Sequence, residues 1–205
     1  HPFQNDWSVA FDENGCIQAL DIDIYSNGGA YADLSTSVME RAMLHAENAY
    51  FIPNARIRGT VCRLNIHPNT AFRGFGGPQG IATMEAIIEE IADSLGLDPL
   101  LVRRRNVYGA EGLTTPYGQE VQNNTLPELF DQLAEQTNYA ERRTQIARHN
   151  QSDPMLLKGI SIAPVKFGIS FTSRFLNQGN ALVNLHTDGT VQVATGGTEM
   201  GQGLF

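Results

Sequence analysis

The chain has 205 residues and a net charge of −8, with 41% hydrophobic and 18% charged residues, a composition typical of a soluble globular protein. The acidic balance argues against a nucleic-acid or anionic-membrane surface, and no apolar run approaches the roughly 20 residues of a membrane span. Only two cysteines, Cys16 and Cys62, are present, which argues against a disulfide scaffold, a zinc ribbon or a cysteine-held iron–sulfur cluster and suits the cytoplasm.

The N-terminal region predicts a β-hairpin. Apolar and polar residues alternate over residues 7–11 and again over 18–24, and Asn14-Gly15 lies between the two runs. Asn-Gly between alternating runs is the strongest short-range hairpin signal, because both residues tolerate the positive φ angles of a tight turn. We expect the second strand to lead into a loop over residues 25–29.

Two amphipathic helices are predicted next. Ser37 and Glu40 have the spacing of a capping box, which predicts a helix that begins there and ends before Pro53. Pro78 suits the first turn of a second helix, whose apolar residues recur on one face until Gly96 stops it. Each helix therefore has an apolar side that can pack on a core.

The remaining segments complete an α+β pattern. Residues 157–171 alternate like a strand with a phase slip at a proline, and residues 181–194 predict a second hairpin around Asp188-Gly189. We expect antiparallel hairpins and a mixed sheet packed with several amphipathic helices, rather than a regular βαβ series, over residues 1–205 with a subdomain change near 150–157. The other predicted elements are a strand over 56–66, a short helix from 98 to about 108, and capped helices that begin near Thr125 and Asn138.

Two clusters of glycines are candidate ligand-binding loops. The first, over residues 72–79, comes directly before a strong helix, whose free N–H groups and partial positive charge attract anions. Its glycines allow close backbone approach, and Arg73 offers a bidentate contact. The second, over residues 196–203, follows a strand and includes Gln202, whose amide both donates and accepts. The alternatives are a tight turn with Phe72 and Phe75 in the core, and a plain hairpin exit.

Arg41 is a further candidate. It would lie about four residues into a helix capped by Ser37, where a cation near the positive helix end is unfavourable by about 0.3–1 kcal/mol. A bound anion or carbonyl group would explain that position. The alternative is an exposed arginine that pairs with Glu40 or Glu47.

Other aromatic and charged runs are less specific. Phe167 and Phe171 share one face of a predicted strand, and they either pack in the core or stack on a flat ring ligand. Arg103-Arg104-Arg105 follows an acidic helix and predicts a solvated or paired surface. Asp21 and Asp23 are spaced like the start of a calcium loop, but the glycine and glutamate that such a loop needs are missing.

Several separate motifs carry a family resemblance. They are Tyr25-Ser-Asn-Gly28, Met39-Glu-Arg41, Thr70-Ala-Phe-Arg-Gly-Phe-Gly-Gly-Pro-Gln79, Phe167-Gly-Ile-Ser-Phe-Thr172 and Gly196-Gly-Thr-Glu-Met-Gly-Gln-Gly203. Together they resemble, in order and over essentially the whole chain, the molybdenum-binding portion of the xanthine dehydrogenase/xanthine oxidase family. The resemblance implies a molybdenum-molybdopterin cofactor whose dithiolene holds the metal, so that no cluster of protein metal ligands is needed.

The resemblance also implies a role for each matched residue. Arg41 would hold a substrate carbonyl and stabilise the negative charge that develops on it. Phe75 and Phe171 would enclose a planar purine, with Thr172 at its polar edge. The residues that would line the cofactor, largely through backbone N–H groups and one side-chain amide, are Phe72, Arg73, Gly74, Met200, Gly201 and Gln202.

The implied activity is the oxidative hydroxylation of hypoxanthine and xanthine to urate, with oxygen from water, in cytoplasmic purine catabolism. Iron–sulfur clusters and FAD on other domains or subunits would take up the electrons. The catalytic glutamate of the family has no match, so we expect an excised fragment that is inactive alone and self-associates through an exposed apolar patch. An aldehyde or other N-heterocycle oxidase and an inert structural module are the alternatives, and Arg41 favours a purine hydroxylase over an aldehyde oxidase.

Overall fold

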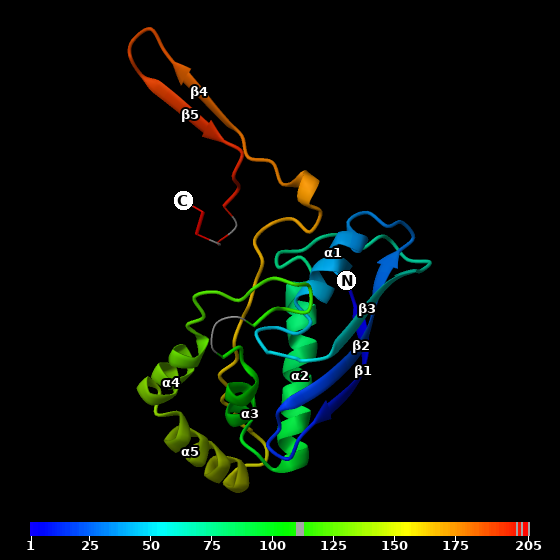
Figure 1. Cartoon of the computed structure of the whole chain (residues 1–205), viewed down its shortest axis with the longest axis vertical. Coiled ribbons are helices and arrows are strands. Elements are labelled where there is room, and N and C mark those ends of the chain that lie inside the picture. Colours follow the sequence, from blue (N-terminus) through cyan, green and yellow to red (C-terminus); the bar gives the residue numbers. More distant parts are fainter. Residues whose placement is uncertain (110–112, 200, 202, 205) are drawn as a thin grey trace. The chain divides into compact units, whose positions relative to one another are not determined.

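The computed structural model describes residues 1–109, 113–199, 201 and 203–204. The chain divides into two compact units, His1–Phe167 and Gly168–Phe205 (Figure 1). The first unit contains a sheet and helices, and the second contains a short 3-10 helix and a hairpin.

A three-stranded sheet with the order β1-β2-β3 is the base of the first unit: β1 (Phe3–Phe11), β2 (Ile17–Gly29) and β3 (Ala55–Arg63). β1 and β2 are antiparallel, with Trp7 opposite Ile22, so the predicted hairpin around Asn14-Gly15 is confirmed. β2 and β3 are parallel, with Ile22 opposite Ile57, because helix α1 (Ser35–Leu44) carries the chain back between them. The expected α+β class with a mixed sheet is confirmed, and it includes a β-α-β crossover that the sequence pattern did not predict.

Helices pack on one face of this sheet. Figure 1 shows α2 (Gly77–Leu95) running along it. This helix has Pro78 in its first turn and Gly96 as its C-cap, whose φ of +64° suits glycine. Burial of each large apolar side chain between α2 and the sheet contributes about 1.5–3 kcal/mol. The core includes Ile22, Ile24, Met84, Ile87, Ile88 and Ile91. The helices after α1 are α2 (Gly77–Leu95), α3 (Pro99–Asn106), α4 (Leu126–Gln136) and α5 (Tyr139–Ser152).

The second unit contains the predicted C-terminal hairpin. Strands β4 (Ala181–Leu185) and β5 (Val191–Thr195) pair in antiparallel fashion, after a 3-10 helix η1 (Arg174–Leu176). The turn is fixed locally, because the Asp188 carboxylate accepts the Thr190 N–H at 2.9 Å and Gly189 has a φ of +86°.

The predicted start of the first helix was wrong. α1 begins at Ser35, with Leu34 as its N-cap and without a side-chain cap, and it ends at Leu44. Ser37 therefore lies within the first turns of the helix instead of capping it. The chain before it also differs, because residues 25–29 belong to β2 and are not a loop.

The strand predicted over residues 157–171 was also wrong. The structure has no β-strand in this segment, all of which it describes, although the residues alternate in polarity. Several of its backbone groups bond to side chains instead of to a neighbouring strand: the Asn150 amide bonds the N–H and carbonyl of Lys158 at 2.9 Å each. At such positions the side chain satisfies the backbone without a partner strand.

Candidate functional site

The candidate site begins with the close packing of α1 on α2. A Cβ atom at Gly76 would lie 2.1 Å from the carbonyl oxygen of Val38, and one at Gly80 would lie 2.2 Å from that of Ala42. Both distances are far below an ordinary carbon–oxygen contact of about 3.3 Å. The two glycines therefore allow the first turns of α2 to lie directly on the backbone of α1, which brings the 72–77 loop beside Arg41.

The 72–77 loop consists of two overlapping tight turns. The Phe75 N–H donates to the Phe72 carbonyl at 2.7 Å, and the Gly77 N–H donates to the Gly74 carbonyl at 2.9 Å. Gly74 has a φ of +95°, and Phe75 adopts a left-handed φ of +53°, which costs of order 1–3 kcal/mol for a non-glycine residue. Phe72 is 85% exposed, so the alternative that placed it in the core is wrong.

The open side of this loop fits an anionic or heterocyclic group such as a pterin cofactor. Within the described part of the chain, nothing accepts a hydrogen bond from the N–H of Arg73 or Gly74. Successive free N–H groups beside a helix N-terminus form a concave anion-binding surface. The side chain of Arg73 is exposed on the same loop and adds a positive charge.

Arg41 lies in the last turn of α1 and is only 6% exposed. The expectation that it sits near the positive end of a helix was wrong, because α1 ends three residues later, at a terminus that favours cations. The alternative of an exposed arginine was wrong too. Its guanidinium carbon lies 5.8 Å from the centre of the Phe75 ring and 5.2 Å from that of Phe167. Burial lowers the pKa of Arg41, although an arginine remains charged at neutral pH.

His45 and Phe167 also lie beside Arg41. The Nδ1–H of His45 donates to the Arg41 carbonyl at 2.7 Å, and its ring centre lies 4.9 Å from that of Phe167. Burial lowers the pKa of His45, which keeps the imidazole neutral. Phe167 is 44% exposed and does not lie in a strand, so the alternative that placed it in the core was wrong. Stacking on a flat ring ligand stays a prediction.

The other predicted site residues belong to the second unit. The backbone of Phe171 exchanges two hydrogen bonds with the Asn177 side chain, at 2.7 and 2.9 Å, and Thr172 is half-buried beside it in sequence. The Glu199 carboxylate accepts the N–H of Gly201, so this acid holds the second glycine loop together. Met200 and Gln202 lie outside the described residues. The structure thus brings Arg41 and Phe75 together within the first unit, alongside the Phe72-Arg73-Gly74 loop.

Sequence reasoning missed a buried polar network beside this site. Arg103, which was expected on the surface, is buried and pairs with Glu85 at 2.8 Å and Glu89 at 2.5 Å. Glu85 also accepts hydrogen bonds from the Tyr50 hydroxyl at 2.6 Å and from the Asn48 amide at 2.8 Å. The acidic residues on α2, opposite the arginine run, were the available signal for this network.

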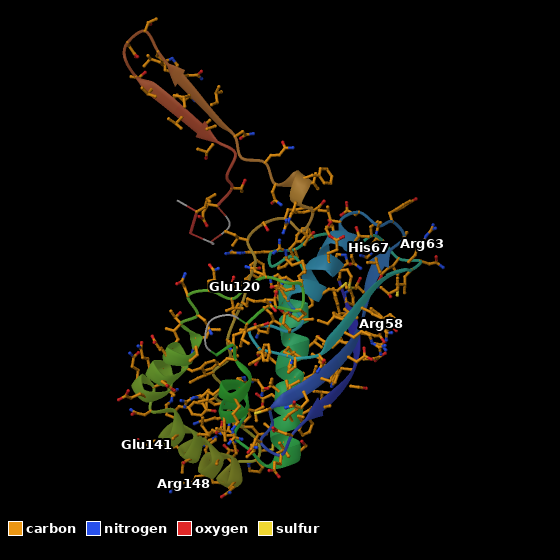
Figure 2. All side chains as sticks on the ribbon, viewed as in Figure 1. Arg58, Arg63, His67, Glu120, Glu141 and Arg148 are labelled. Carbon is orange, nitrogen blue, oxygen red and sulfur yellow. The ribbon has the colours of Figure 1, made fainter. Side chains whose placement is uncertain are left out.

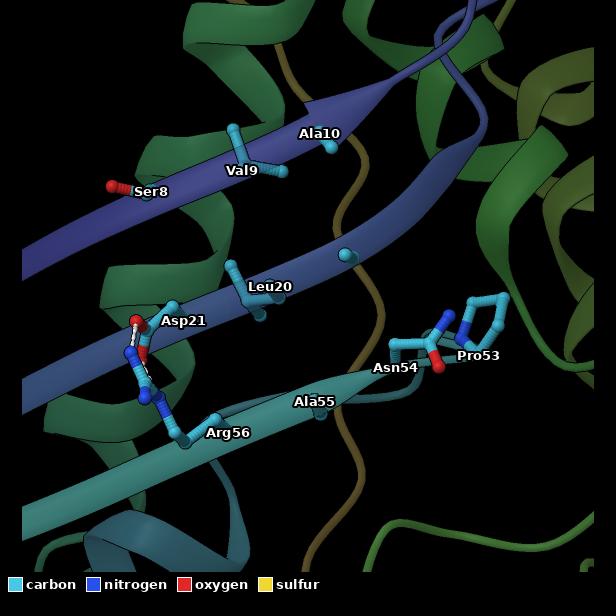
Figure 3. Close-up of a pocket in the computed structure, with 10 residues that line it drawn as sticks. Ser8, Val9, Ala10, Leu20, Asp21, Pro53, Asn54, Ala55 and Arg56 are labelled. Atoms are coloured by element: carbon cyan, nitrogen blue, oxygen red, sulfur yellow. Dashed lines mark hydrogen bonds and ion pairs between the residues drawn. The ribbon is translucent and has the colours of Figure 1, made fainter.

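A shallow hollow lies elsewhere on the sheet, along β1, β2 and β3 (Figure 3). Its Asp21 pairs with Arg56, and Asp23 pairs with Arg58, which projects from β3 together with Arg63 (Figure 2). These ion pairs occupy the two carboxylates whose spacing is like that of a calcium loop. The hollow contains none of the predicted site residues.

Two other kinds of site can be judged from the part of the chain that the structure describes. None of the helices in that part of the chain is long and apolar enough to cross a membrane. No group of three His, Cys, Asp or Glu side chains there is arranged to hold a metal ion.

Known proteins match this chain over its whole length. Residues 1–107 and 132–205 each match a family described as a molybdopterin cofactor-binding domain. The chain is 47% identical over 204 residues to the xanthine dehydrogenase/oxidase of Mus musculus and 45% identical over 207 residues to the nicotinate hydroxylase hnxS of Emericella nidulans. It covers 15% of the length of each of these relatives, and they cover all of it.

A solved structure has the same fold. The aldehyde oxidoreductase of Desulfovibrio desulfuricans superposes with a TM-score of 0.65 at 31% sequence identity. The match covers 71% of this chain and 16% of that enzyme.

Proposed function

Because the chain belongs to the molybdopterin cofactor-binding domain family, we propose that it forms the molybdopterin- and substrate-binding part of a xanthine dehydrogenase. The reaction is the oxidative hydroxylation of hypoxanthine and xanthine to urate with oxygen from water. When bound, the molybdopterin cofactor supplies the two-electron oxidation. Iron–sulfur and FAD domains or subunits are the proposed electron-transfer partners. The free thiols of Cys16 and Cys62 fit a cytoplasmic location.

The observation that carries the proposal is a charged guanidinium buried between aromatic rings. Arg41 presents a rigid fork of N–H donors, which suits the carbonyl oxygen of an oxopurine and the negative charge that builds on it during reaction. Because water is largely excluded at 6% exposure, that interaction is stronger than it would be on the surface. Phe75 offers a ring beside the same position for the planar part of the substrate.

The cofactor would be held by the two glycine loops. In the first unit, the Phe72-Arg73-Gly74 segment would donate to it through the free backbone N–H groups of Arg73 and Gly74. In the second unit, Met200, Gly201 and Gln202 are proposed to contact it, and Phe171 and Thr172 are proposed to contact the substrate.

Replacement of Arg41 in the holoenzyme that carries this chain tests the proposal. Arg41→Met should lower kcat/KM for xanthine more than tenfold, which is a loss of at least about 1.4 kcal/mol of transition-state binding, and should spare aromatic aldehydes. Arg104→Met, which removes an exposed arginine, is the matched control. Unchanged xanthine kinetics in Arg41→Met would contradict the proposal.

A hydroxylase for another N-heterocycle is the second candidate, and the 45% identity to a nicotinate hydroxylase supports it. The buried guanidinium of Arg41 would suit a substrate carboxylate as well as a carbonyl. A substrate panel on the intact enzyme separates the two, because a higher kcat/KM for nicotinate than for xanthine would replace the first assignment.

We also propose that the 205-residue chain is inactive alone, because it covers 15% of the length of its relatives. Stoichiometric molybdenum and xanthine turnover in the purified chain would contradict this.

A further inference from the structure

Phe167 lies directly against the proposed substrate anchor. Its ring centre is 5.2 Å from the Arg41 guanidinium carbon and 4.9 Å from the His45 ring centre. On another side, a Cβ atom at Gly77 would lie 2.5 Å from Cε2 of Phe167. The absence of a side chain at Gly77 therefore makes room for this ring at the start of α2.

The backbone around Phe167 is held by one buried asparagine. The Asn48 side chain donates to the Pro164 carbonyl at 2.9 Å and accepts the Lys166 N–H at 3.2 Å. Asn48 is fully buried and has a φ of +50°, a left-handed conformation that asparagine tolerates better than most residues. Its amide also donates to Glu85 at 2.8 Å, which connects the segment to α2.

The side chain of Lys166 is held from two directions. Its ammonium group pairs with Glu47, which is fully buried, and donates to the Tyr117 hydroxyl at 2.9 Å. The same ammonium lies 4.9 Å from the centre of the Tyr117 ring. A buried carboxylate needs its cation, so this pair resists separation.

Without these contacts, little would fix the segment. It belongs to no strand, and within residues 157–167 the buried residues are Ile162 and Pro164. Asn48 and Glu47 follow Arg41 by seven and six residues on the same stretch of chain. The region that carries the arginine therefore also carries the groups that place Phe167 against it.

We propose that Phe167 is a positioning residue for Arg41, held in place by a clamp that consists of Glu47, Asn48 and Lys166. The inference rests on the proposed role of Arg41 in substrate binding. The Phe167 ring limits the rotamers of the guanidinium and keeps its N–H fork directed at the substrate. Phe167 thus acts through Arg41 rather than by stacking on the substrate.

A double-mutant cycle in the holoenzyme tests the positioning role. Phe167→Leu should raise the xanthine Kd and lower kcat/KM by about 2- to 30-fold, the range of a cation–π contact, and should leave aldehyde kinetics unchanged. In the Arg41→Met background, Phe167→Leu should cause no further loss. Phe11→Leu is the matched control, because it makes the same change from a ring to leucine far from Arg41. Phe11 lies in the hairpin of β1 and β2, which packs near Leu95 at the other end of α2.

The outcomes separate this inference from the proposed function. If Arg41→Met leaves kcat/KM for xanthine unchanged, the proposed function fails. If Arg41→Met lowers kcat/KM and Phe167→Leu adds its full effect on top, the function stands and the positioning role is overturned.

The clamp is tested by paired substitutions at Lys166. Lys166→Met should raise the xanthine Kd, and Lys166→Arg should restore it because arginine also pairs with Glu47. If Lys166→Met lowers only the thermal stability and leaves the xanthine Kd at the wild-type value, the clamp is overturned.

Discussion

The contact between α1 and α2 allows a sharp test of how closely these two helices pack. Alanine is about 1 kcal/mol better than glycine in a helix interior, so Gly80→Ala would ordinarily stabilise α2. Here the new Cβ atom would lie 2.2 Å from the Ala42 carbonyl oxygen and 3.2 Å from the Ala46 nitrogen. Relief of that overlap requires the two helix backbones to move apart by about 1 Å, to an ordinary contact of about 3.3 Å.

The expected result is a net loss of about 2 kcal/mol. Overpacking costs about 1–3 kcal/mol, and we expect the upper end because backbone atoms on both sides cannot rotate away. The gain in helix propensity of about 1 kcal/mol offsets part of this cost. Gly159→Ala is the control, because no atom lies within 4 Å of a Cβ there. It should leave the stability unchanged or raise it by up to about 1 kcal/mol.

Urea unfolding followed by tryptophan fluorescence measures both variants. The chain has a single tryptophan, Trp7, which is half-buried on β1, a strand that packs against α2. Its emission therefore reports the unfolding of the first unit. A Gly80→Ala variant that is as stable as the wild type, or more stable, would show that the two helix backbones do not pack this closely.

Two further predictions concern buried titratable side chains. Arg103→Met should lower the free energy of unfolding by about 3–5 kcal/mol, because it leaves Glu85 without its cation. Arg104→Met removes an exposed pair with Asp131 and should lower it by at most about 1 kcal/mol. Equal melting temperatures of the two variants by calorimetry would contradict this. Burial lowers the pKa of His45, so below about pH 6.5 the unfolded state binds more protons than the folded state. The His45 contribution to the free energy of unfolding should therefore be constant above about pH 6.5. Below that pH it should fall by up to about 1.4 kcal/mol per pH unit. Urea unfolding between pH 5 and 8 should show a shallower slope for His45→Gln, and an unchanged slope would exclude His45 as its source.

Elements with local signals could be predicted from the sequence. Asn14-Gly15 and Asp188-Gly189 impose turns through their own backbone preferences, and both hairpins are present. α2 begins and ends where Pro78 and Gly96 predict, because those two residues restrict the backbone at the ends. In each case the deciding interaction lies within a few residues of the signal.

Elements decided by distant contacts could not be predicted. The alternating residues of 157–171 look like a strand, but Asn48, more than a hundred residues earlier, supplies the hydrogen bonds that a strand partner would have supplied. The parallel pairing of β2 with β3 likewise depends on how α1 packs, which periodicity does not reveal. The start of α1 was misplaced because Ser37 matched a capping box that the helix does not use.

In the candidate site, too, the residues themselves could be predicted from the sequence, but their environment could not. The motif resemblance identified Arg41 and Phe75, and the structure places their side chains together. It could not identify the environment of Arg41, because burial by Phe167 and His45 depends on tertiary packing. The roles of Arg41 and Phe75, like those of Phe171, Thr172 and Gly201, stay predictions that rest on the motifs.

The first glycine cluster has two physical purposes that a sequence cannot separate. Gly76 and Gly77 face inward, where added side chains would strike the Val38 carbonyl and the Phe167 ring. Gly74 has its N–H free among the described residues, so it can face a ligand. Because both purposes are served within four residues, the loop that would hold the cofactor is fixed by the same packing that buries Arg41. A change that loosens the contact between α1 and α2 should therefore disturb cofactor and substrate contacts together.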